Sequence, residues 1–326
     1  PVLLVYSTML ILVNKYVKNN MDMKNKSFDF NAFYTQYTKY YPKNKLPSQD
    51  FLEWFMGFFE GDGSMIMGKS ANYTIMVQSY KDKKVLQYIQ NNFNMGTIAM
   101  HSSKDKTTSW SVKNTKHMYL LCLLFNGNLV LPIRLLTFIG FISKINIKLF
   151  KNNEDIIKMN LNVITPTLND HWIAGFTDAE GCFSASVYSK IDRSWTFNVT
   201  YVTSQKYESN KYVLEHMLNL FNLANNKPVN ETLPLSGVES NKSLGKVSPH
   251  SKPNVWDLRI TGYKNCNKML FYFDTYSLKS NKLKSYSMFK EVLLSVEKGE
   301  HTNPDKRTKT KELCKTMNKS NMKVLK

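Results

Sequence analysis

The feature that most constrains this chain is a ten-residue stretch that occurs twice. Residues 54–63 read WFMGFFEGDG, and residues 172–181 read WIAGFTDAEG. The two copies share a Trp, a Gly, a Phe, an acid, a small residue, a second acid and a closing Gly at identical spacing. An internal repeat indicates a repeated structural unit. We therefore expect two related halves, each of which brings one carboxylate to a shared site.

The charge of the chain narrows the partners it can have. Forty-four Lys and Arg residues against 25 Asp and Glu residues give a net charge of +19 over 326 residues. This excess predicts a polyanionic partner, either nucleic acid or an anionic membrane surface. The 42% hydrophobic and 13% aromatic content excludes a disordered basic protein. The length suits two domains, each with its own core.

The cysteines and histidines do not form a metal-binding motif. Cys122, Cys182, Cys266 and Cys314 lie far apart, with no paired short spacing and no matching His cluster, which argues against zinc. We expect the first three to be buried thiols and the last to lie in a polar tail. The six histidines are scattered, and no nucleophile-elbow motif supports a Ser/His/Asp triad.

We interpret residues 1–48 as a leader or linker. Residues 2–13 form the only long apolar run, about two-thirds of what a membrane span needs. The run lacks the flanking features of a signal peptide. It is either a short buried helix or the remnant of a span encoded by an upstream exon. Residues 14–44 are polar and show no helical or strand period, which is typical of a linker.

The first half is predicted over residues 49–151. Asp50 is expected to be the N-cap of its first helix, with Glu53 completing a capping box. This helix should run to Asp62 and close at Gly63 in the left-handed conformation. The elements expected after it are strands 64–69 and 73–79, a helix over 82–93, strands 95–101 and 109–113, and helices over 117–125 and 133–147.

The second half is predicted over residues 170–297, after a linker over 152–169. The expected elements are a helix over 170–180, strands 182–189 and 195–205, a helix over 208–221, strands 227–231 and 255–261, and helices over 266–276 and 283–297. Residues 232–254 are expected to form an inserted loop. Residues 298–326 are expected to be a mobile, solvated basic tail. The fold class is therefore α+β, with two pseudo-symmetric αββαββα halves.

The repeated helices each carry two small residues four positions apart. These residues are Gly57, Gly61, Gly175 and Ala179. The spacing alone is common. Because it recurs in both copies beside a carboxylate, we predict that the two helices pack through these faces. Asp62 and Glu180 would then lie together at one end of the helix pair.

Two adjacent carboxylates repel unless a cation lies between them. Mg²⁺ prefers oxygen ligands, and the free carbonyl groups of the last helical turn, at Gly61 and Ala179, add such ligands to Asp62 and Glu180. For a strongly basic chain the matching reaction is metal-assisted phosphodiester hydrolysis. The alternative interpretation is that the acids are exposed carboxylates at helix ends.

The two stretches resemble the signature of the LAGLIDADG homing endonucleases in its double-motif form, over about residues 50–297. The nine-letter motif aligns with FMGFFEGDG at residues 55–63 and IAGFTDAEG at residues 173–181. The resemblance implies a pseudo-dimer with the motif helices at its centre and two antiparallel sheets that form a saddle over the DNA major groove. It implies that Asp62 and Glu180 bind two or three divalent ions and that each cuts one strand.

The chain departs from this motif at two positions. Glu60 replaces the sixth-position Asp, and Gly61 replaces the seventh-position Ala. Members of this family use a basic residue near each active acid, and the resemblance implies that role for Lys282 in the second half. The first half has no clear partner of this kind, and Arg134 is the candidate.

Polar and basic side chains on and after the strands are the candidates for DNA contact. Amide and cationic side chains match base edges, and exposed lysines match phosphates. The candidates for base contact are Lys69, Gln78, Lys190, Arg193, Gln205 and Lys206, and those for phosphate contact are Lys81, Lys83 and Lys84.

Three functions are compatible with these patterns. The first is a mitochondrial, intron-encoded, site-specific DNA endonuclease of the matrix, monomeric and without a small-molecule substrate. The second is an RNA maturase that assists splicing of its own group I intron, with or without DNA cleavage. Both acids favour cleavage, whereas the unclear basic partner in the first half and the basic tail favour RNA binding. The third is a structural protein of a ribonucleoprotein, which would need no metal.

Overall fold

A computed structural model of the chain describes residues 27–68, 72–189, 195–225 and 243–321. The chain divides into two compact units, residues 1–179 and 180–326. The first unit therefore includes all of the second motif helix except its last residue. This division falls later than the 152–169 linker that we expected.

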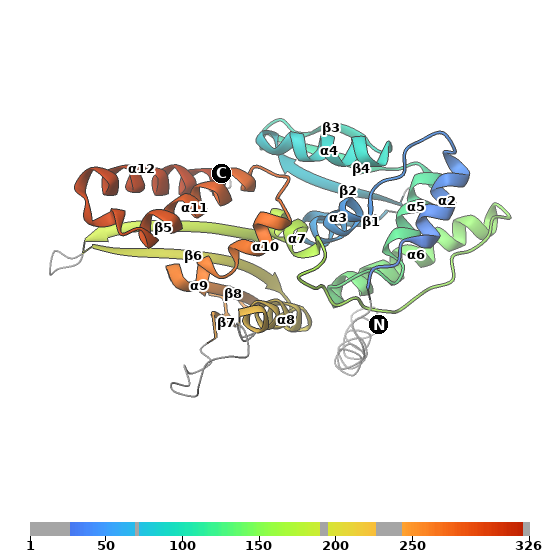
Figure 1. The fold of residues 1–326 in the computed structure, drawn as a ribbon. Coiled ribbons are helices and arrows are strands. Elements are labelled where there is room, and N and C mark those ends of the chain that lie inside the picture. Colours follow the sequence, from blue (N-terminus) through green and yellow to red (C-terminus); the bar gives the residue numbers. More distant parts are fainter. Residues whose placement is uncertain (1–26, 69–71, 190–194, 226–242, 322–326) are drawn as a thin grey trace. The chain divides into compact units, whose positions relative to one another are not determined.

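The first unit combines helices with one four-stranded antiparallel sheet (Figure 1). Its elements are α2 (Asn31–Tyr40), α3 (Gln49–Asp62), β1 (Gly63–Met67), β2 (Asn72–Ser79), η1 (Tyr80–Asp82), α4 (Lys83–Phe93), β3 (Thr97–Ser102), β4 (Thr107–Val112), α5 (Thr115–Phe125), α6 (Pro132–Lys151) and α7 (Trp172–Glu180). The strand order is β1-β2-β4-β3. Every expected element of this half is present.

The second unit repeats the same sheet. Its elements are β5 (Gly181–Ser189), β6 (Trp195–Lys206), α8 (Glu208–Asn225), β7 (Gly245–Pro249), β8 (Val255–Thr261), α9 (Tyr263–Asn267), α10 (Leu270–Thr275), α11 (Lys282–Glu297), η2 (Glu300–Thr302) and α12 (Pro304–Asn321). The strand order β5-β6-β8-β7 matches that of the first sheet, and all pairs are antiparallel. The α+β fold with two related antiparallel sheets is confirmed.

Helix α3 is apolar on all sides because it lies at the centre of the first unit. Trp54, Phe55, Phe58 and Phe59 are each 0% exposed. A helix that is hydrophobic around its whole circumference has to be covered on every face. Burial of these four aromatic side chains makes α3 a large source of hydrophobic stability in this unit.

The two ends of α3 differ from the prediction. Ser48, not Asp50, is the N-cap, and its Oγ accepts from the Phe51 backbone N–H at 3.2 Å. Gly63 does not close the helix in the left-handed conformation. It has φ −81° and ψ 158° and is the first residue of β1. Glycine is needed there because a Cβ atom would come within 2.6 Å of the Phe59 ring.

The segment before α3 is not a linker throughout. Residues 31–40 form α2, in which Phe33 and Tyr37 lie four positions apart and are 0% exposed. The Tyr37 hydroxyl donates to the carbonyl of Phe93 at 3.0 Å. The interpretation of residues 14–44 as a linker is therefore wrong for α2. The apolar run at residues 2–13 lies outside the described residues.

The C-terminal segment is also more ordered than predicted. Residues 304–321 form α12, which packs on β5 and α11 (Figure 1). Thr310, Cys314 and Met317 are at most 5% exposed and recur at helical spacing. Cations of the same helix lie over the Trp195 ring, with the Lys311 Nζ 3.9 Å from its centroid. The expectation of a solvated tail is wrong for this helix.

The fourth strand of the second sheet also departs from the prediction. The expected strand 227–231 lies outside the described residues. The strand that pairs with β8 is β7 (Gly245–Pro249), which falls inside the segment expected to be an inserted loop. Helix 266–276 is divided into α9 and α10.

All four cysteines are free thiols. Cys122, Cys266 and Cys314 are buried, and burial raises the pKa of each thiol, to about 11 for Cys314. Cys182 is half-buried rather than buried. Within the residues that the structure describes, no helix is long and apolar enough to cross a membrane.

Candidate active site and nucleic-acid interface

Helices α3 and α7 pack through Gly57 and Gly175, two of the four small residues predicted for this contact. A Cβ atom at Gly57 would come within 2.7 Å of the backbone N of Phe176. A Cβ atom at Gly175 would come within 2.8 Å of the backbone C of Trp54. Backbone cannot move aside as a flexible side chain can, so the contact requires glycine at both positions.

Two reciprocal hydrogen bonds join the same helices. The Trp54 indole N–H donates to Asp178 Oδ2 at 2.9 Å, and the Trp172 indole N–H donates to Glu60 Oε1 at 3.0 Å. Asp178 and Glu60 are 3% and 0% exposed. The first acid of each motif therefore accepts a bond from the Trp of the other motif. The sequence prediction missed this role, although each acid lies six residues after a Trp in both copies.

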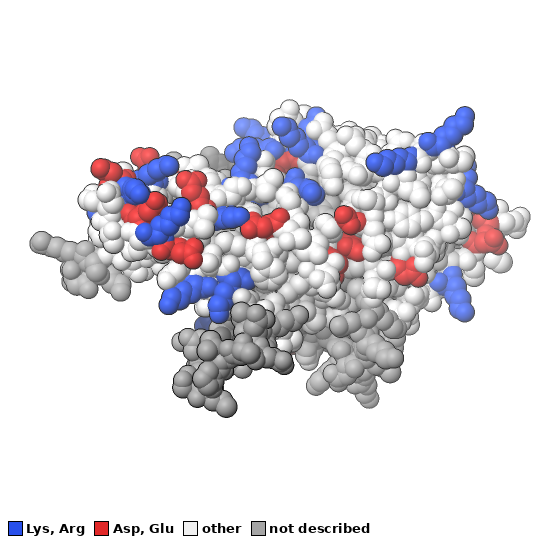
Figure 2. Space-filling view, viewed as in Figure 1, with Lys and Arg blue, Asp and Glu red and all other residues white. Residues whose placement is uncertain are grey.

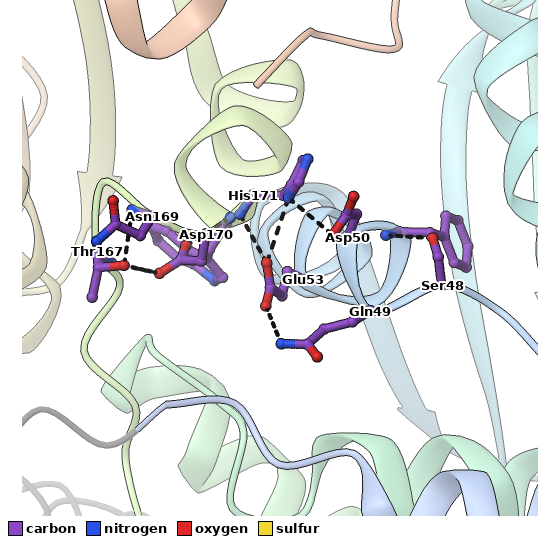
Figure 3. Close-up of polar contacts among 10 residues, drawn as sticks. Ser48, Gln49, Asp50, Glu53, Thr167, Asn169, Asp170 and His171 are labelled. Atoms are coloured by element: carbon purple, nitrogen blue, oxygen red, sulfur yellow. Dashed lines mark hydrogen bonds and ion pairs between the residues drawn. The ribbon is translucent and has the colours of Figure 1, made fainter. Parts of the chain in front are cut away.

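The N-terminal ends of these helices are joined by polar contacts (Figure 3). Glu53 Oε2 accepts from the His171 backbone N–H at 3.1 Å, and Glu53 Oε1 accepts from Gln49 Nε2 at 2.9 Å. The His171 ring lies 3.5 Å from the same carboxylate. Burial favours a higher pKa for Glu53, but the bonds from His171 and Gln49 outweigh it, so the pKa is lowered. Glu53 therefore links α3 to α7 and does not complete the predicted capping box.

Asp170 caps the beginning of α7. Its Oδ1 accepts from the Trp172 backbone N–H at 3.0 Å, and its Oδ2 accepts from the Thr167 N–H at 2.6 Å and the Thr167 hydroxyl at 2.8 Å (Figure 3). Burial raises the pKa of Asp170 to about 6, and these hydrogen bonds oppose the rise.

Asp62 is the last residue of α3 and lies beside an amide and a guanidinium group. Gln78 Nε2, on β2, donates to Asp62 Oδ2 at 2.6 Å. The Arg134 guanidinium, on α6, donates to the carbonyl groups of Glu60 at 2.7 Å and Gly61 at 3.0 Å. The structure thus brings the predicted first-half candidates, Asp62, Gly61 and Arg134, to one helix end.

The carboxylate of Glu60 fixes the loop that leads to Arg134. It accepts from the backbone N–H groups of Val130, at 3.0 Å, and Leu131, at 2.6 Å. Leu131 is the N-cap residue of α6, and Arg134 lies in the first turn of that helix. Burial raises the pKa of Glu60 to about 7, although the N–H donors and the nearby Arg134 favour the ionised form.

The second-half candidates begin at the last residue of α7. Glu180 ends this helix, and β5 begins at the next residue. Lys282 is the first residue of α11. Burial raises the pKa of the Cys182 thiol, and the charges of Lys282 and then Arg259 partly offset this rise. Lys282 therefore lies near Cys182 at the beginning of β5, and Cys182 follows Glu180 by two residues in the chain.

Side chains along each strand of the second sheet alternate between its two faces. One face is available to solvent or a ligand, and we call it the polar face. The opposite face carries buried residues such as Phe183, Tyr201 and Leu258. Cross-strand register places the remaining side chains on one face. The polar face includes Cys182, Ser184, Ser186, Asn198, Thr200, Val202, Ser204, Lys206, Lys246, Ser248, Asp257 and Arg259.

The structure places Gln205 and Lys206, two predicted DNA-contact residues of the second half, in different environments. Lys206 is exposed on the polar face, 5.2 Å from the centroid of the Tyr207 ring. Gln205 lies on the opposite face, is 8% exposed and accepts from Asn210 Nδ2 at 3.0 Å, so its assignment to base contact is wrong. The prediction failed because neighbouring residues of a strand point to opposite faces of the sheet, so Gln205 and Lys206 cannot both lie on the polar face. Lys69, Lys190 and Arg193 lie outside the described residues.

The remaining predicted residues follow β2. Gln78 is held by Asp62, as described above. Lys81 and Lys84 are exposed and Lys83 is half-exposed, with its Nζ 5.8 Å from the centroid of the Tyr80 ring. These lysines remain candidates for phosphate contact.

The doubled motif and the paired helices coincide with a known family. The LAGLIDADG endonuclease family matches residues 55–145 and 173–293, which is more than half of the chain. This chain belongs to the LAGLIDADG endonuclease family. Each of the two matched segments begins in one of the packed helices α3 and α7.

Fungal intron-encoded proteins are among its relatives. A probable intron-encoded endonuclease 4 of Neurospora crassa is 28% identical over 254 residues, which cover 77% of this chain and 41% of that protein. The intron-encoded DNA endonuclease aI3 of Saccharomyces cerevisiae is 23% identical over 284 residues, covering 81% and 65%. The chain thus spans less than two thirds of either relative.

Solved LAGLIDADG structures share its fold. The meganuclease I-AabMI bound to uncleaved DNA matches with a TM-score of 0.64 and 20% identity, covering 82% of this chain and 99% of that one. The homing endonuclease I-LtrWI bound to target DNA matches with a TM-score of 0.59 and 18% identity, covering 84% and 100%.

The donor set at the end of α3 fits a hard divalent cation. The Asp62 carboxylate and the Gly61 carbonyl are adjacent oxygen donors of the kind that Mg²⁺ and Ca²⁺ prefer. Among the described residues, no group of three or more His, Cys, Asp or Glu side chains could hold a metal. A cation in this LAGLIDADG protein would therefore need ligands beyond its side chains, such as backbone carbonyls and phosphate oxygens.

Charge on α11 and α12 of this LAGLIDADG protein is mixed. Figure 2 shows Lys and Arg side chains interspersed with Asp and Glu over these helices. Ion pairs join Lys290 to Asp274 at 2.8 Å and Lys306 to Glu300 at 2.9 Å. The basic composition of the C-terminal segment is therefore partly neutralised locally, which weakens its case as a separate polyanion-binding surface.

Proposed function

We propose that this chain is a site-specific DNA endonuclease that hydrolyses phosphodiesters at Asp62 and Glu180. The observation that carries the proposal is the packing of α3 on α7 through Gly57 and Gly175, because each of these helices ends at one of the two acids. Family membership and the DNA-bound fold relatives support the same activity.

Asp62 and the Gly61 carbonyl would hold a divalent cation in the first half, and Glu180 and the Ala179 carbonyl would do so in the second. When bound, Mg²⁺ supplies Lewis-acid stabilisation of the charge that builds up on the phosphate. Gln78 orients the Asp62 carboxylate through its 2.6 Å hydrogen bond. Arg134 and Lys282 supply positive charge for the scissile phosphates of the two strands.

The DNA partner would contact the polar face of the second sheet and the corresponding face of the first. The lysines that follow β2 would contact phosphates, which fix register without reading sequence. We further propose that the protein acts as a monomer in the mitochondrial matrix. The names of its fungal relatives, among them a cox1 intron-2 protein of Schizosaccharomyces pombe, support an intron-encoded origin.

Cleavage of DNA that carries the uninterrupted exon junction tests the proposal. Wild type with Mg²⁺ should cut supercoiled plasmid at one place within that junction. The Asp62→Asn, Glu180→Gln double variant should bind the same DNA without cutting it. Lys309→Ala is a matched control, because this exposed residue lies on α12 and should leave cutting unchanged. If wild type cuts neither the junction nor any site in a random library, the endonuclease proposal fails.

A second function, assistance in splicing of a group I intron, is favoured by one contact. The Gly61 carbonyl already accepts a bond from Arg134, so a metal ion there would have to share this oxygen with the guanidinium group. A protein that had exchanged cleavage for RNA binding could keep this contact. Splicing by the Asp62→Ala, Glu180→Ala variant separates the two functions, since a maturase would retain splicing while DNA cutting is lost.

A further inference from the structure

Arg259 and Asp257 form a fixed pair on the polar face of the second sheet. They lie two positions apart on β8, so both side chains project from the same face. Arg259 Nη2 donates to Asp257 Oδ2 at 2.8 Å. The Ser204 hydroxyl, from the neighbouring strand β6, donates to Asp257 Oδ1 at 2.6 Å. Both carboxylate oxygens are therefore engaged from within the sheet.

Exposure separates the roles of the two charged groups. The Asp257 side chain is 4% exposed, whereas that of Arg259 is 44% exposed. The carboxylate lies beneath the surface and the guanidinium projects from it. Because one N–H of Arg259 is used by Asp257, the other donors of the planar group remain available in a fixed orientation.

The pair also has a defined place along the sheet. Cross-strand register puts Arg259 in one row with Cys182, Val202 and Lys246. The charge of Arg259 acts on the Cys182 thiol together with that of Lys282. Arg259 is therefore near the beginning of β5, which follows Glu180 directly in the chain.

The pairing favours a base edge over a phosphate as the partner of Arg259. The buried carboxylate reduces the net charge of the pair, so Arg259 attracts a phosphate less strongly than an unpaired cation does. It retains directional donors, and these suit a partner with two acceptors in one plane. Lys206 and Lys246 are exposed cations of the same face, and among the described cations of this face Arg259 alone is paired with a carboxylate.

We propose that Arg259 reads a guanine in the major groove of the DNA target and that Asp257, held by Ser204, orients it. Guanine presents O6 and N7 side by side, which matches two guanidinium N–H groups. Asp257 itself is not placed to accept from cytosine, because its side chain is only 4% exposed and both of its oxygens already accept bonds within the sheet. This inference rests on the proposed DNA-binding function and adds the base that one residue of the site specifies.

Selection of bound sequences from a randomised duplex library, in buffer without divalent metal, tests the inference. Wild type should select a site with guanine at a position in the half bound by the second sheet. Arg259→Ala should lose about 10- to 100-fold of preference at that position and keep its preference elsewhere. Asp257→Asn should relax the same position, with a thermal unfolding midpoint that shows the variant is folded.

Lys246→Ala is the matched control, because Lys246 is the cross-strand neighbour of Arg259 on β7. It should weaken binding to all sequences alike and reduce the salt dependence of binding. If Arg259→Ala behaves in this way too, or leaves both affinity and preference unchanged, Arg259 does not read a base and the inference is wrong. If wild type selects no sequence at all, the proposed function fails as well, and the two failures are thereby distinguished.

Discussion

The two acids in each motif have different environments and therefore different roles. Glu60 and Asp178 are buried and accept indole N–H groups across the α3–α7 contact. Asp62 is half-exposed and accepts from Gln78 at the end of its helix. A carboxylate that is surrounded by protein donors fixes structure, whereas one that keeps access to solvent can bind a cation.

The protonation of Glu60 gives the unfolding free energy a defined pH dependence. Its folded-state pKa of about 7 lies above the ordinary value of 4.5. This group's contribution to stability is therefore fully present below pH 4.5 and is lost as pH rises through 7, by about 3 kcal/mol. In Glu60→Gln that fall should disappear, as measured by urea unfolding at a series of pH values.

Glu53→Gln is the control for this prediction, because the shift at Glu53 has the opposite sign. Its lowered pKa means that the stabilising contribution is present above pH 4.5 and is lost as pH falls below that value. Equal pH profiles for wild type and Glu60→Gln between pH 4.5 and 7 would contradict the assignment of Glu60.

A single methyl group tests the close approach of α3 and α7. Gly57→Ala places a Cβ atom against the α7 backbone and should reduce the unfolding free energy by about 1–3 kcal/mol. Gly140→Ala is the matched control, because that glycine lies inside α6 and its Cβ would meet only the flexible Met67 side chain, at 3.3 Å. It should be neutral or stabilising by up to about 1 kcal/mol. Equal effects of the two substitutions would show that the helices are not in contact at Gly57.

At the scale of helices and strands, a helix with a regular amphipathic pattern, such as α4, was predictable. Helix α2, whose buried residues are two aromatic side chains, was not. Val85, Leu86, Ile89 and Phe93 set a helical period, and all four are buried in α4 as expected. Helix α2 escaped prediction because only two of its side chains are buried, in a polar segment. Its stability comes from tertiary packing, which a local pattern does not reveal.

Helix α12 and strand β7 were missed for related reasons. The buried side of α12 contains Thr310 and Cys314. These residues are not strongly apolar, so the sequence shows no clear hydrophobic period there. Strand β7 follows a long polar segment, so its pairing with β8 depends on contacts distant in sequence. The candidate site could also be predicted only in part. The repeat alone singles out Asp62 and Glu180, whereas the contacts that Gln78 and Arg134 make depend on how the chain folds.

Helix α2 should be part of the stable first unit. Phe33→Ala should reduce the unfolding free energy by about 3–5 kcal/mol, because the ring is fully buried. Thr35→Ala, at an exposed position of the same helix, should change it by less than about 0.5 kcal/mol. Thermal or urea unfolding followed by tryptophan fluorescence measures both. A negligible effect of Phe33→Ala would mean that α2 does not pack as described.

At the scale of the whole molecule, the sheet is repeated while its surroundings diverge. Both sheets have the same strand order, and both motif helices use Gly and Trp at matching positions. The additional elements differ, with α2 in the first unit and α12 in the second. Such divergence would allow each half to contact a different DNA sequence if the proposed target is asymmetric.

The most direct test of the account is the strand specificity of single acid variants on supercoiled DNA that carries the target. Wild type with Mg²⁺ should produce linear plasmid. Asp62→Asn and Glu180→Gln should each slow cleavage of one strand by at least about 100-fold, through loss of a metal ligand, and accumulate nicked circles. Sequencing the nicks should place them on opposite strands for the two variants. Linear product from either variant at the wild-type rate would contradict the assignment of one acid to each strand.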